Sequence, residues 1–256
     1  IRNNDLVAST QGRSFWILDD LTQIHQYNSK IKNEDFHLFK PTVTYRTRGG
    51  SSKSNTIGQN PPNGAVILYY LQDDLNKDTN VKLEFLNDNK IIRKITNKPG
   101  ESAITFDNGR YSSPALPTKK GVNRFIWNLR VDDITMVKDV SFYGSYLGYR
   151  IGPGNYTVRL TVDDNSVDQN LLLKRDPRID IKDRDNRAHQ QMMTDLYNQI
   201  NDLHSSIVKA RNVRSQIQKM NSELEVMDNM EEILEAGKKA INALDKWEGK
   251  VLQTKM

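Results

Sequence analysis

The sequence has no cysteine, which excludes disulfide scaffolds, thiolate zinc sites and cysteine nucleophiles. It also lacks any run of 18 consecutive apolar residues, so we expect no membrane span. The chain does not open with a signal-peptide pattern, which is a basic start followed by an apolar stretch and a small-residue cleavage site. Because the sequence begins at Ile1, we expect it to be a fragment of a longer protein, so the missing leader carries little weight.

Apolar residues make up 36 % of the chain, and adding the 14 glycines still leaves the total below the share of about 45–50 % that is usual for globular proteins. This deficit favours elongated or solvent-rich parts over one large core. A length of 256 residues suits two or three compact pieces.

The net charge of +5 raises the question of nucleic-acid binding. Residues 182–256 carry twelve basic and twelve acidic side chains, so the excess lies in residues 1–181. Its densest part is residues 40–53, with four basic side chains and no acidic one. A nucleic-acid binder concentrates charge on a helix face or stripe and interleaves it with aromatics. Here the basic side chains lie in one glycine-serine loop. We therefore expect this loop to be solvated and expect no nucleic-acid partner.

Residues 1–40 open with two short predicted strands, DLVAS and SFWIL, joined by a turn that contains Gly12. Apolar side chains occupy both faces of the second strand, namely Phe15 and Ile17 on one face and Trp16 and Leu18 on the other. A strand that is apolar on both faces is typical of one covered on both sides. We therefore expect the hairpin either to dock on the rest of the chain or to expose Phe15 and Trp16.

Residues 41–181 show six or seven short strand patterns with turn signals about every ten residues, among them AVILYYL, VKLEFLN, IIRKI, GVNRFIWNLR and NYTVRLTV. This spacing over about 140 residues predicts an immunoglobulin-like or fibronectin-III-like β-sandwich. Tyr156 follows a Pro-Gly turn. Its hydroxyl either bonds to nearby backbone, as in a tyrosine corner, or the side chain simply packs in the core.

Residues 182–256 change to helical periodicity. A first apolar seam runs over Met193, Leu196, Ile200, Leu203, Ile207, Ala210, Val213, Ile217, Met220 and Leu224. A second seam follows after EVMDN, over Met230, Leu234, Gly237, Ile241, Leu244 and Val251, with Trp247 beside it. We expect helices of about 40 and 25 residues that fold back as a long antiparallel hairpin. The wide seam suggests that further helices or a partner cover it.

Catalytic and metal-binding patterns are weak. The four Asp-Asp doublets, which begin at Asp19, Asp73, Asp132 and Asp163, lie where strands end, so turn chemistry explains them. His189 and His204 lie too far apart along one helix to share a metal, and His25 and His37 lack an acidic cluster at ligand spacing. The sequence has neither a G-x-S-x-G elbow nor a phosphate-binding GK[ST] loop. We expect no catalytic residue, metal or cofactor in this chain.

Several stretches, taken in order, resemble one family: DLVASTQGRSFWILDDL, GQNPPNGAVILYYL, GVNRFIWNLR, GPGNYTVRLTV, and DPR before the paired helices. They resemble the C-terminal region of bacterial sortilin-like, BNR-repeat glycosyl hydrolase proteins, in which a long β-propeller precedes a sandwich and a helical tail. The resemblance covers nearly the whole chain. The family's aspartate box, S-x-D-x-G-x-T-W, is absent from this sequence. The resemblance therefore implies that the propeller lies outside this chain and that no catalytic residue carries over.

On this resemblance, residues 1–40 are the remnant of the last propeller blade and a linker, residues 41–181 the sandwich, and residues 182–256 the helical hairpin. It implies a secreted or periplasmic protein. The first hypothesis is a non-catalytic accessory and interaction region that contacts the propeller of the same protein. A protein partner or a second copy would bind through the helices. The expected interface residues are Phe15, Trp16 and Trp247.

Two further hypotheses remain open. In the second hypothesis, the sandwich is a carbohydrate-binding module of a glycosidase. Tyr143, Tyr146 and Tyr149 would stack on sugar rings, and Arg46 and Arg48 would bind acidic groups. Plain loop packing is the alternative explanation of these tyrosines. In the third hypothesis the parent is a sorting-type or peptidase-associated binding protein, because fold does not imply function.

Overall fold

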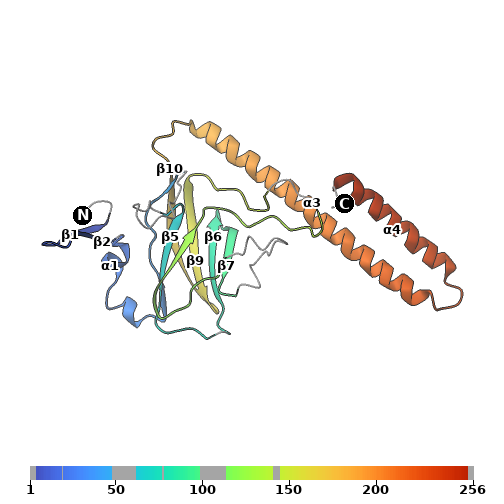
Figure 1. Cartoon of the computed structure of the whole chain (residues 1–256), viewed down its shortest axis with the longest axis horizontal. Helices are drawn as coiled ribbons and strands as arrows, with labels where there is room; N and C mark the ends of the chain where they lie inside the picture. The colour runs from blue at the N-terminus through green and yellow to red at the C-terminus, as the bar shows by residue number, and fades with distance from the viewer. Residues whose placement is uncertain are drawn as a thin grey trace. The chain divides into compact units, whose positions relative to one another are not determined.

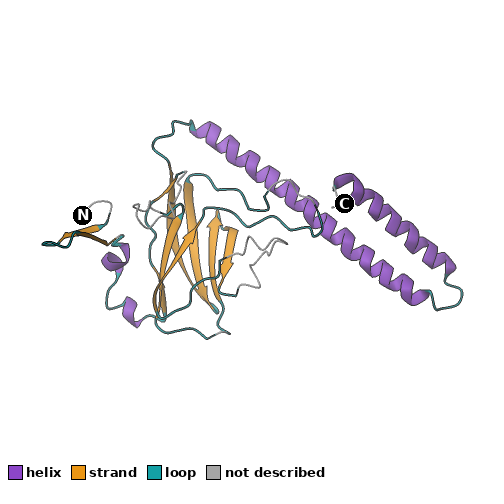
Figure 2. Cartoon of the chain, in the orientation of Figure 1, coloured by secondary structure: helices purple, strands orange, loops and turns teal. Residues whose placement is uncertain are grey.

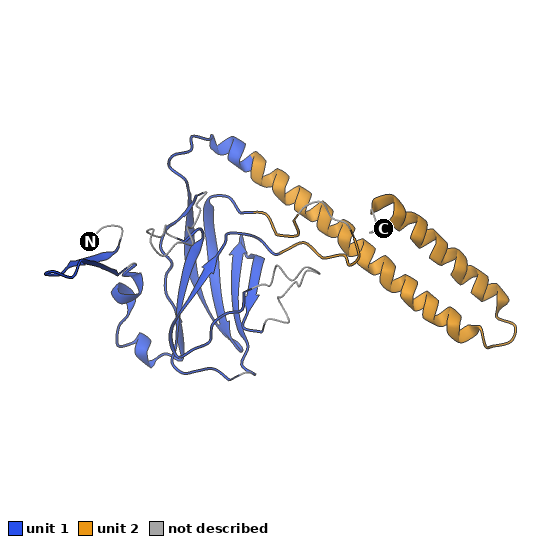
Figure 3. Ribbon diagram, in the orientation of Figure 1, with its two compact units in different colours: residues 1–132, 150–187 blue, residues 133–149, 188–256 orange. Residues whose placement is uncertain are grey.

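The computed structural model describes residues 4–18, 20–47, 62–76, 78–98, 114–140 and 145–252. The chain divides into two compact units, residues 1–132 with 150–187 and residues 133–149 with 188–256 (Figure 3). The first unit contains all the strands of the described structure, and the second contains two long helices (Figure 2). The mixed β plus α class predicted from the sequence is confirmed. Residues 133–149, inside the predicted sandwich segment, group with the helices.

Two sheets form most of the first unit (Figure 1). The smaller has the order β3-β5-β8, with β3 at Phe36–Leu38, β5 at Ala65–Leu71 and β8 at Gly121–Trp127. The larger has the order β4-β10-β9-β6-β7, formed by Thr44–Arg46, Asn165–Arg175, Gly154–Val162, Val81–Asn87 and Lys90–Thr96. All neighbours are antiparallel except β4, which runs parallel to β10.

The core of the first unit lies between these sheets. Trp127 on β8 stacks on Phe85 of β6, with ring centroids 3.9 Å apart and planes 20° apart. Tyr156 on β9 meets the same indole edge-on at 6.4 Å. All three side chains are buried. Because β8 belongs to one sheet and β6 and β9 to the other, these rings pack the sheets face to face.

Tyr156 settles one of the open sequence questions. Its buried hydroxyl donates a 2.7 Å hydrogen bond to the carbonyl of Gly152, four residues upstream. The bond to nearby backbone is therefore confirmed. It fixes the Pro-Gly turn that leads into β9 against the core, because a buried hydroxyl without a partner would be costly.

The N-terminal part of the first unit contains β1 (Leu6–Ser9), β2 (Phe15–Leu18), helix α1 (Thr22–Gln26) and the 3-10 turn η1 (Ile31–Asn33). β1 and β2 form the predicted antiparallel hairpin, with Gly12 at a φ of +76° in its turn. The linker after it packs on the outer face of the smaller sheet. There Ile31, Phe39 and Leu68 form a buried cluster.

The second unit contains α4 (Glu231–Val251) and all of α3 (Asp183–Leu224) except residues 183–187, which confirms the two predicted C-terminal helices. Ion pairs join Arg211 to Glu248 and Arg214 to Asp245, so the two helices run antiparallel. Within the described residues, neither helix has a stretch apolar enough to cross a lipid bilayer.

The predicted apolar seam of α3 is wrong in part. Four of its members are exposed, namely Leu196, Leu203, Val213 and Met220. The buried side of α3 instead includes His204 and Asn221, and α4 buries Glu248. The helical periodicity of apolar residues predicts that the polar side chains of α3 and α4 face solvent. It fails here because His204 and Glu248 have hydrogen-bond or ionic partners that offset the cost of burial.

Candidate functional site

Among the described strands and helices of the first unit, the β1–β2 hairpin is the most exposed apolar element. Trp16 and Leu18 on one face are 66 % and 47 % exposed, and Phe15 and Ile17 on the other are 72 % and 63 % exposed. The cross-strand partners Leu6 and Val7 are exposed as well. An isolated two-stranded hairpin is marginal in water. The surface formed by residues 6–9 and 15–18, here called the hairpin surface, is therefore a candidate interaction site.

Polar contacts hold the base of this hairpin against α1. The Asn4 amide donates to the Asp20 carboxylate at 3.2 Å and to the Thr22 hydroxyl at 2.8 Å. The backbone N–H of Leu21 donates to the Asn4 carbonyl at 2.8 Å, and that of Asp20 donates to the Asp5 carboxylate at 2.9 Å. The hairpin surface is thus presented from a fixed base.

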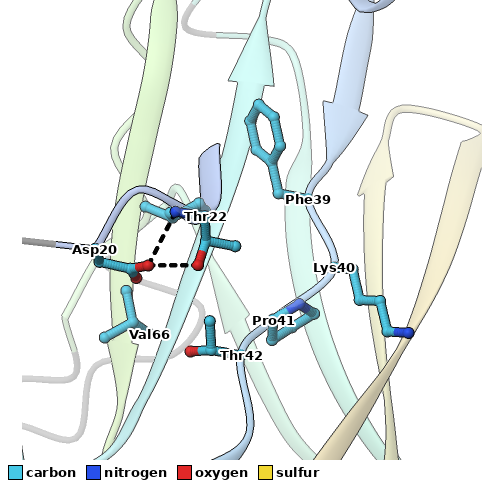
Figure 4. Close-up of a pocket in the computed structure, with 8 residues that line it drawn as sticks. Asp20, Thr22, Phe39, Lys40, Pro41, Thr42 and Val66 are labelled. Atoms are coloured by element: carbon cyan, nitrogen blue, oxygen red, sulfur yellow. Dashed lines mark hydrogen bonds between the residues drawn. The ribbon is translucent and has the colours of Figure 1, made fainter. Parts of the chain in front are cut away.

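A shallow hollow lies beside this base (Figure 4). Asp20 accepts hydrogen bonds from the backbone N–H and the hydroxyl of Thr22 at its rim, and Phe39, Val66 and Leu68 line its apolar side. Its empty volume is about 180 Å³, which includes space open to solvent. Ligand pockets usually enclose roughly 300–1,000 Å³. The hollow is therefore smaller than a typical ligand pocket.

The aspartates of the sequence doublets bond mostly to backbone of other segments, and only Asp20 makes a local turn bond, to Thr22 two residues on. Five of the described carboxylates accept a backbone N–H: Asp74 from Lys120, Asp132 from Lys94, Asp133 from Gly148, Asp163 from Asn80, and Asp20 from Thr22. Asp19 lies outside the described residues. No cluster of three metal-ligating side chains occurs within the described ranges. These carboxylates hold neighbouring segments together and bond to five different backbone groups.

Two other carboxyl groups have shifted acidities. Hydrogen bonds from the Arg178 guanidinium and backbone N–H lower the pKa of Asp176 to about 2. A hydrogen bond from Arg159 also holds the pKa of Asp168 below its usual value. A general acid needs a raised pKa, because it must keep its proton until the reaction. Both shifts have the opposite sign and indicate structural ion pairs.

The predicted sugar-binding residues fall in different places. Tyr143 and Arg48 lie outside the described residues, and Arg46 is on β4 of the first unit. Tyr146 lies with its ring 5.8 Å from that of His204. Tyr149 meets the Tyr197 ring edge-on at 5.6 Å, and its hydroxyl bonds to that of Thr194 at 2.9 Å. Tyr146 and Tyr149 are half-buried against α3, and sugar stacking by them stays a prediction.

The segment 133–140 is anchored on α3 by a polar network. The Asn201 carboxamide oxygen accepts the backbone N–H of Thr135 at 2.9 Å and its hydroxyl at 2.7 Å. The His204 imidazole donates from Nδ1 to the Thr135 carbonyl at 2.8 Å. Arg211 donates to the Lys138 carbonyl in the same way. Sequence periodicity missed this network because helix side chains bonded to loop backbone leave no repeating apolar signal.

Comparison with family models, with curated proteins and with solved structures gives no match for this chain. The resemblance to sortilin-like BNR-repeat proteins therefore stays a prediction.

Proposed function

We propose that this chain is a non-catalytic accessory and interaction region, and that the hairpin surface binds another β-structured part of the same protein, the propeller implied by the resemblance. The observation that carries this is the exposure of apolar side chains on both faces of the hairpin, with Phe15 72 % exposed. Strands that are apolar on both faces suit a position with layers on each side. Hydrophobic burial of these side chains would drive the association.

The remainder of the first unit would brace this contact. We propose that it is an immunoglobulin-like sandwich, and the strand order supports this. If the short β4 is left out, the sandwich has seven strands in chain order, from β3 to β10. The smaller sheet contains the first, second and fifth of these seven strands, and the larger sheet contains the other four. The bond from Tyr156, near the start of β9, to the carbonyl of Gly152 is a feature that such sandwiches share.

Tryptophan accessibility tests the proposal. The difference in acrylamide quenching between the unsubstituted protein and a Trp16→Phe variant reports on Trp16 alone. We expect strong quenching in this chain and strong protection in the longer protein that also carries the propeller. Phe15→Ser should weaken the association, whereas Val122→Ser, which changes an exposed apolar side chain on β8, should not. Free quenching of Trp16 in the longer protein would refute the proposal.

Carbohydrate binding is the second candidate. The half-buried Tyr146 and Tyr149, three residues apart on one loop, favour it. Calorimetric titration with neutral and acidic oligosaccharides tests it, with Tyr149→Ala as the variant expected to lose binding. Absence of heat at millimolar sugar would remove this candidate and leave the first untouched.

A further inference from the structure

The α4 helix carries two adjacent stripes of small and apolar residues. The first, Leu234, Gly237, Ile241, Leu244, Glu248 and Val251, is buried or half-buried in the hairpin. The second is shifted by one position and consists of Ile233, Ala236, Ala240, Ala243 and Trp247. Its spacing of 3-4-3-4 places it along one line of the helix. Ile233 is 49 % exposed and Trp247 is 37 % exposed, so this second stripe is open to solvent.

Helix α3 adds two exposed apolar side chains on the same side of the hairpin. Val213 and Met220, each 47 % exposed, directly precede Arg214 and Asn221, which contact α4. In an antiparallel pair, residues one position before the packing positions lie on the same side of both helices. The ion pair from Arg211 to Glu248 places Val213 level with Trp247. We call the surface formed by Val213, Met220, Ile233, Ala240 and Trp247 the helical face.

Charge is distributed unevenly along this hairpin. The end distant from its turn, residues 209–216 and 243–250, carries five basic and two acidic side chains. The turn end, residues 217–242, carries six acidic and three basic ones. Lys246 and Lys250 at the first end, and Glu231 and Glu232 at the second, are exposed and make no ion pair among the described residues.

We propose that the helical face binds the same face of a second copy of this chain, with the two hairpins antiparallel to each other. A two-fold axis near Ala240 and Met220 brings the basic end of each hairpin over the acidic turn end of the other. It also sets Trp247 of one copy opposite Ile233 of the other. The result is a four-helix bundle, the usual way in which helical hairpins bury a second apolar stripe.

Charge complementarity is what selects this partner. A parallel arrangement would set basic ends against basic ends and acidic turns against acidic turns, which like-charge repulsion disfavours. This inference concerns a different surface from the hairpin surface and does not depend on the proposed function.

Sedimentation velocity of the full chain over micromolar to submillimolar concentrations tests the proposal. We expect a dimer that weakens as salt is raised, because exposed charges are screened. Lys246→Glu with Lys250→Glu should give a monomer, and so should Glu232→Lys with Glu235→Lys. Mixing these two variants in equal amounts should restore dimers, since the swapped charges are again opposite. Far-UV circular dichroism verifies that each variant keeps its helices.

An apolar substitution gives a second, independent test. Trp247→Gln should raise the dimer dissociation constant at least about tenfold, as expected for a central aromatic side chain. Leu196→Gln is the matched control, because Leu196 is 42 % exposed on α3 but lies off the helical face. The proposal is overturned if the chain is monomeric throughout, if the swapped variants still self-associate, or if their mixture stays monomeric. Dimers that are lost with Phe15→Ser and kept with Trp247→Gln would overturn it in favour of the hairpin surface.

Discussion

Gly237 of α4 packs directly against the side chain of Asn221 on α3: a Cβ added to Gly237 would lie 2.4 Å from Oδ1 and 2.7 Å from Nδ2 of that residue. Asn221 is buried, so its amide cannot swing into solvent without opening the contact. We expect Gly237→Ala to lower the free energy of unfolding by about 1–3 kcal/mol, as for an overpacked core. Urea unfolding followed by far-UV circular dichroism measures this.

Gly237→Ala should change the free energy of unfolding in the opposite direction when Asn221 is truncated. In an Asn221→Ala background the space opposite Gly237 is open, so Gly237→Ala should raise stability by up to about 1 kcal/mol through helix propensity. Asn221→Ala alone should cost little, because the buried Oδ1 of Asn221 has no hydrogen-bond partner among the described residues. Equal effects of Gly237→Ala in both backgrounds would contradict the contact.

Gly64 approaches the backbone of the neighbouring strand even more closely. A Cβ on Gly64 would lie 2.2 Å from the carbonyl oxygen of Trp127, and backbone in a paired strand cannot rotate away. We expect Gly64→Ala to cost about 3 kcal/mol or to abolish cooperative unfolding of the first unit. Thermal unfolding followed by tryptophan fluorescence measures this. Gly249→Ala is the control, since nothing lies within 4 Å of that Cβ, and it should be neutral or stabilising.

Asp176 predicts a loss of stability in acid. Its pKa is about 2 in the folded chain, because Arg178 donates hydrogen bonds from its guanidinium and its backbone N–H to the carboxylate. An unfolded aspartate has a pKa of about 4. The stabilisation is therefore complete above about pH 4 and is lost as the pH falls from about 4 to about 2. Asp176→Asn should flatten this dependence, whereas Asp180→Asn, at an exposed position, should leave it unchanged.

Substitution of Asn201 should have a local effect on the segment 133–140, because its carboxamide bonds to Thr135. Removing its carboxamide with Asn201→Ala leaves the backbone N–H and the hydroxyl of Thr135 without their common acceptor. We expect faster hydrogen–deuterium exchange at Thr135 and a cost of about 1–3 kcal/mol, while the two helices stay intact. Asn198→Ala, on the exposed side of the same helix, is the matched control. Unchanged exchange at Thr135 would show that other contacts hold the loop.

The sequence alone predicted the elements whose apolar pattern matches their environment. AVILYYL became β5 (Ala65–Leu71) residue for residue, because turn residues precede it and both of its faces are covered. The helices were predicted because a period near 3.6 persists over many turns. The hairpin was predicted from Gly12 and the two flanking apolar runs.

Features that depend on polar contacts between distant segments could not be predicted. The attachment of Thr135 to Asn201 and His204 involves one loop backbone and two helix side chains, and no local rule links them. Burial of Glu248 depends on Arg211 and Arg214 being opposite it, which only the register of the hairpin decides. From the sequence, Asn201 and Glu248 would be expected on the surface, because charged and amide side chains are usually exposed.

The parallel neighbours β4 and β10 have a mechanical consequence. Thr44, Tyr45 and Arg46 pair with Leu173, Lys174 and Arg175 where the chain enters and leaves the larger sheet. Tension applied along the chain pulls these two strands in opposite directions, so their hydrogen bonds are loaded together in shear. An antiparallel hairpin pulled from its open end would instead unzip one bond after another. Force applied between the N-terminal end of β4 and the helix that follows β10 would therefore be resisted by these hydrogen bonds together.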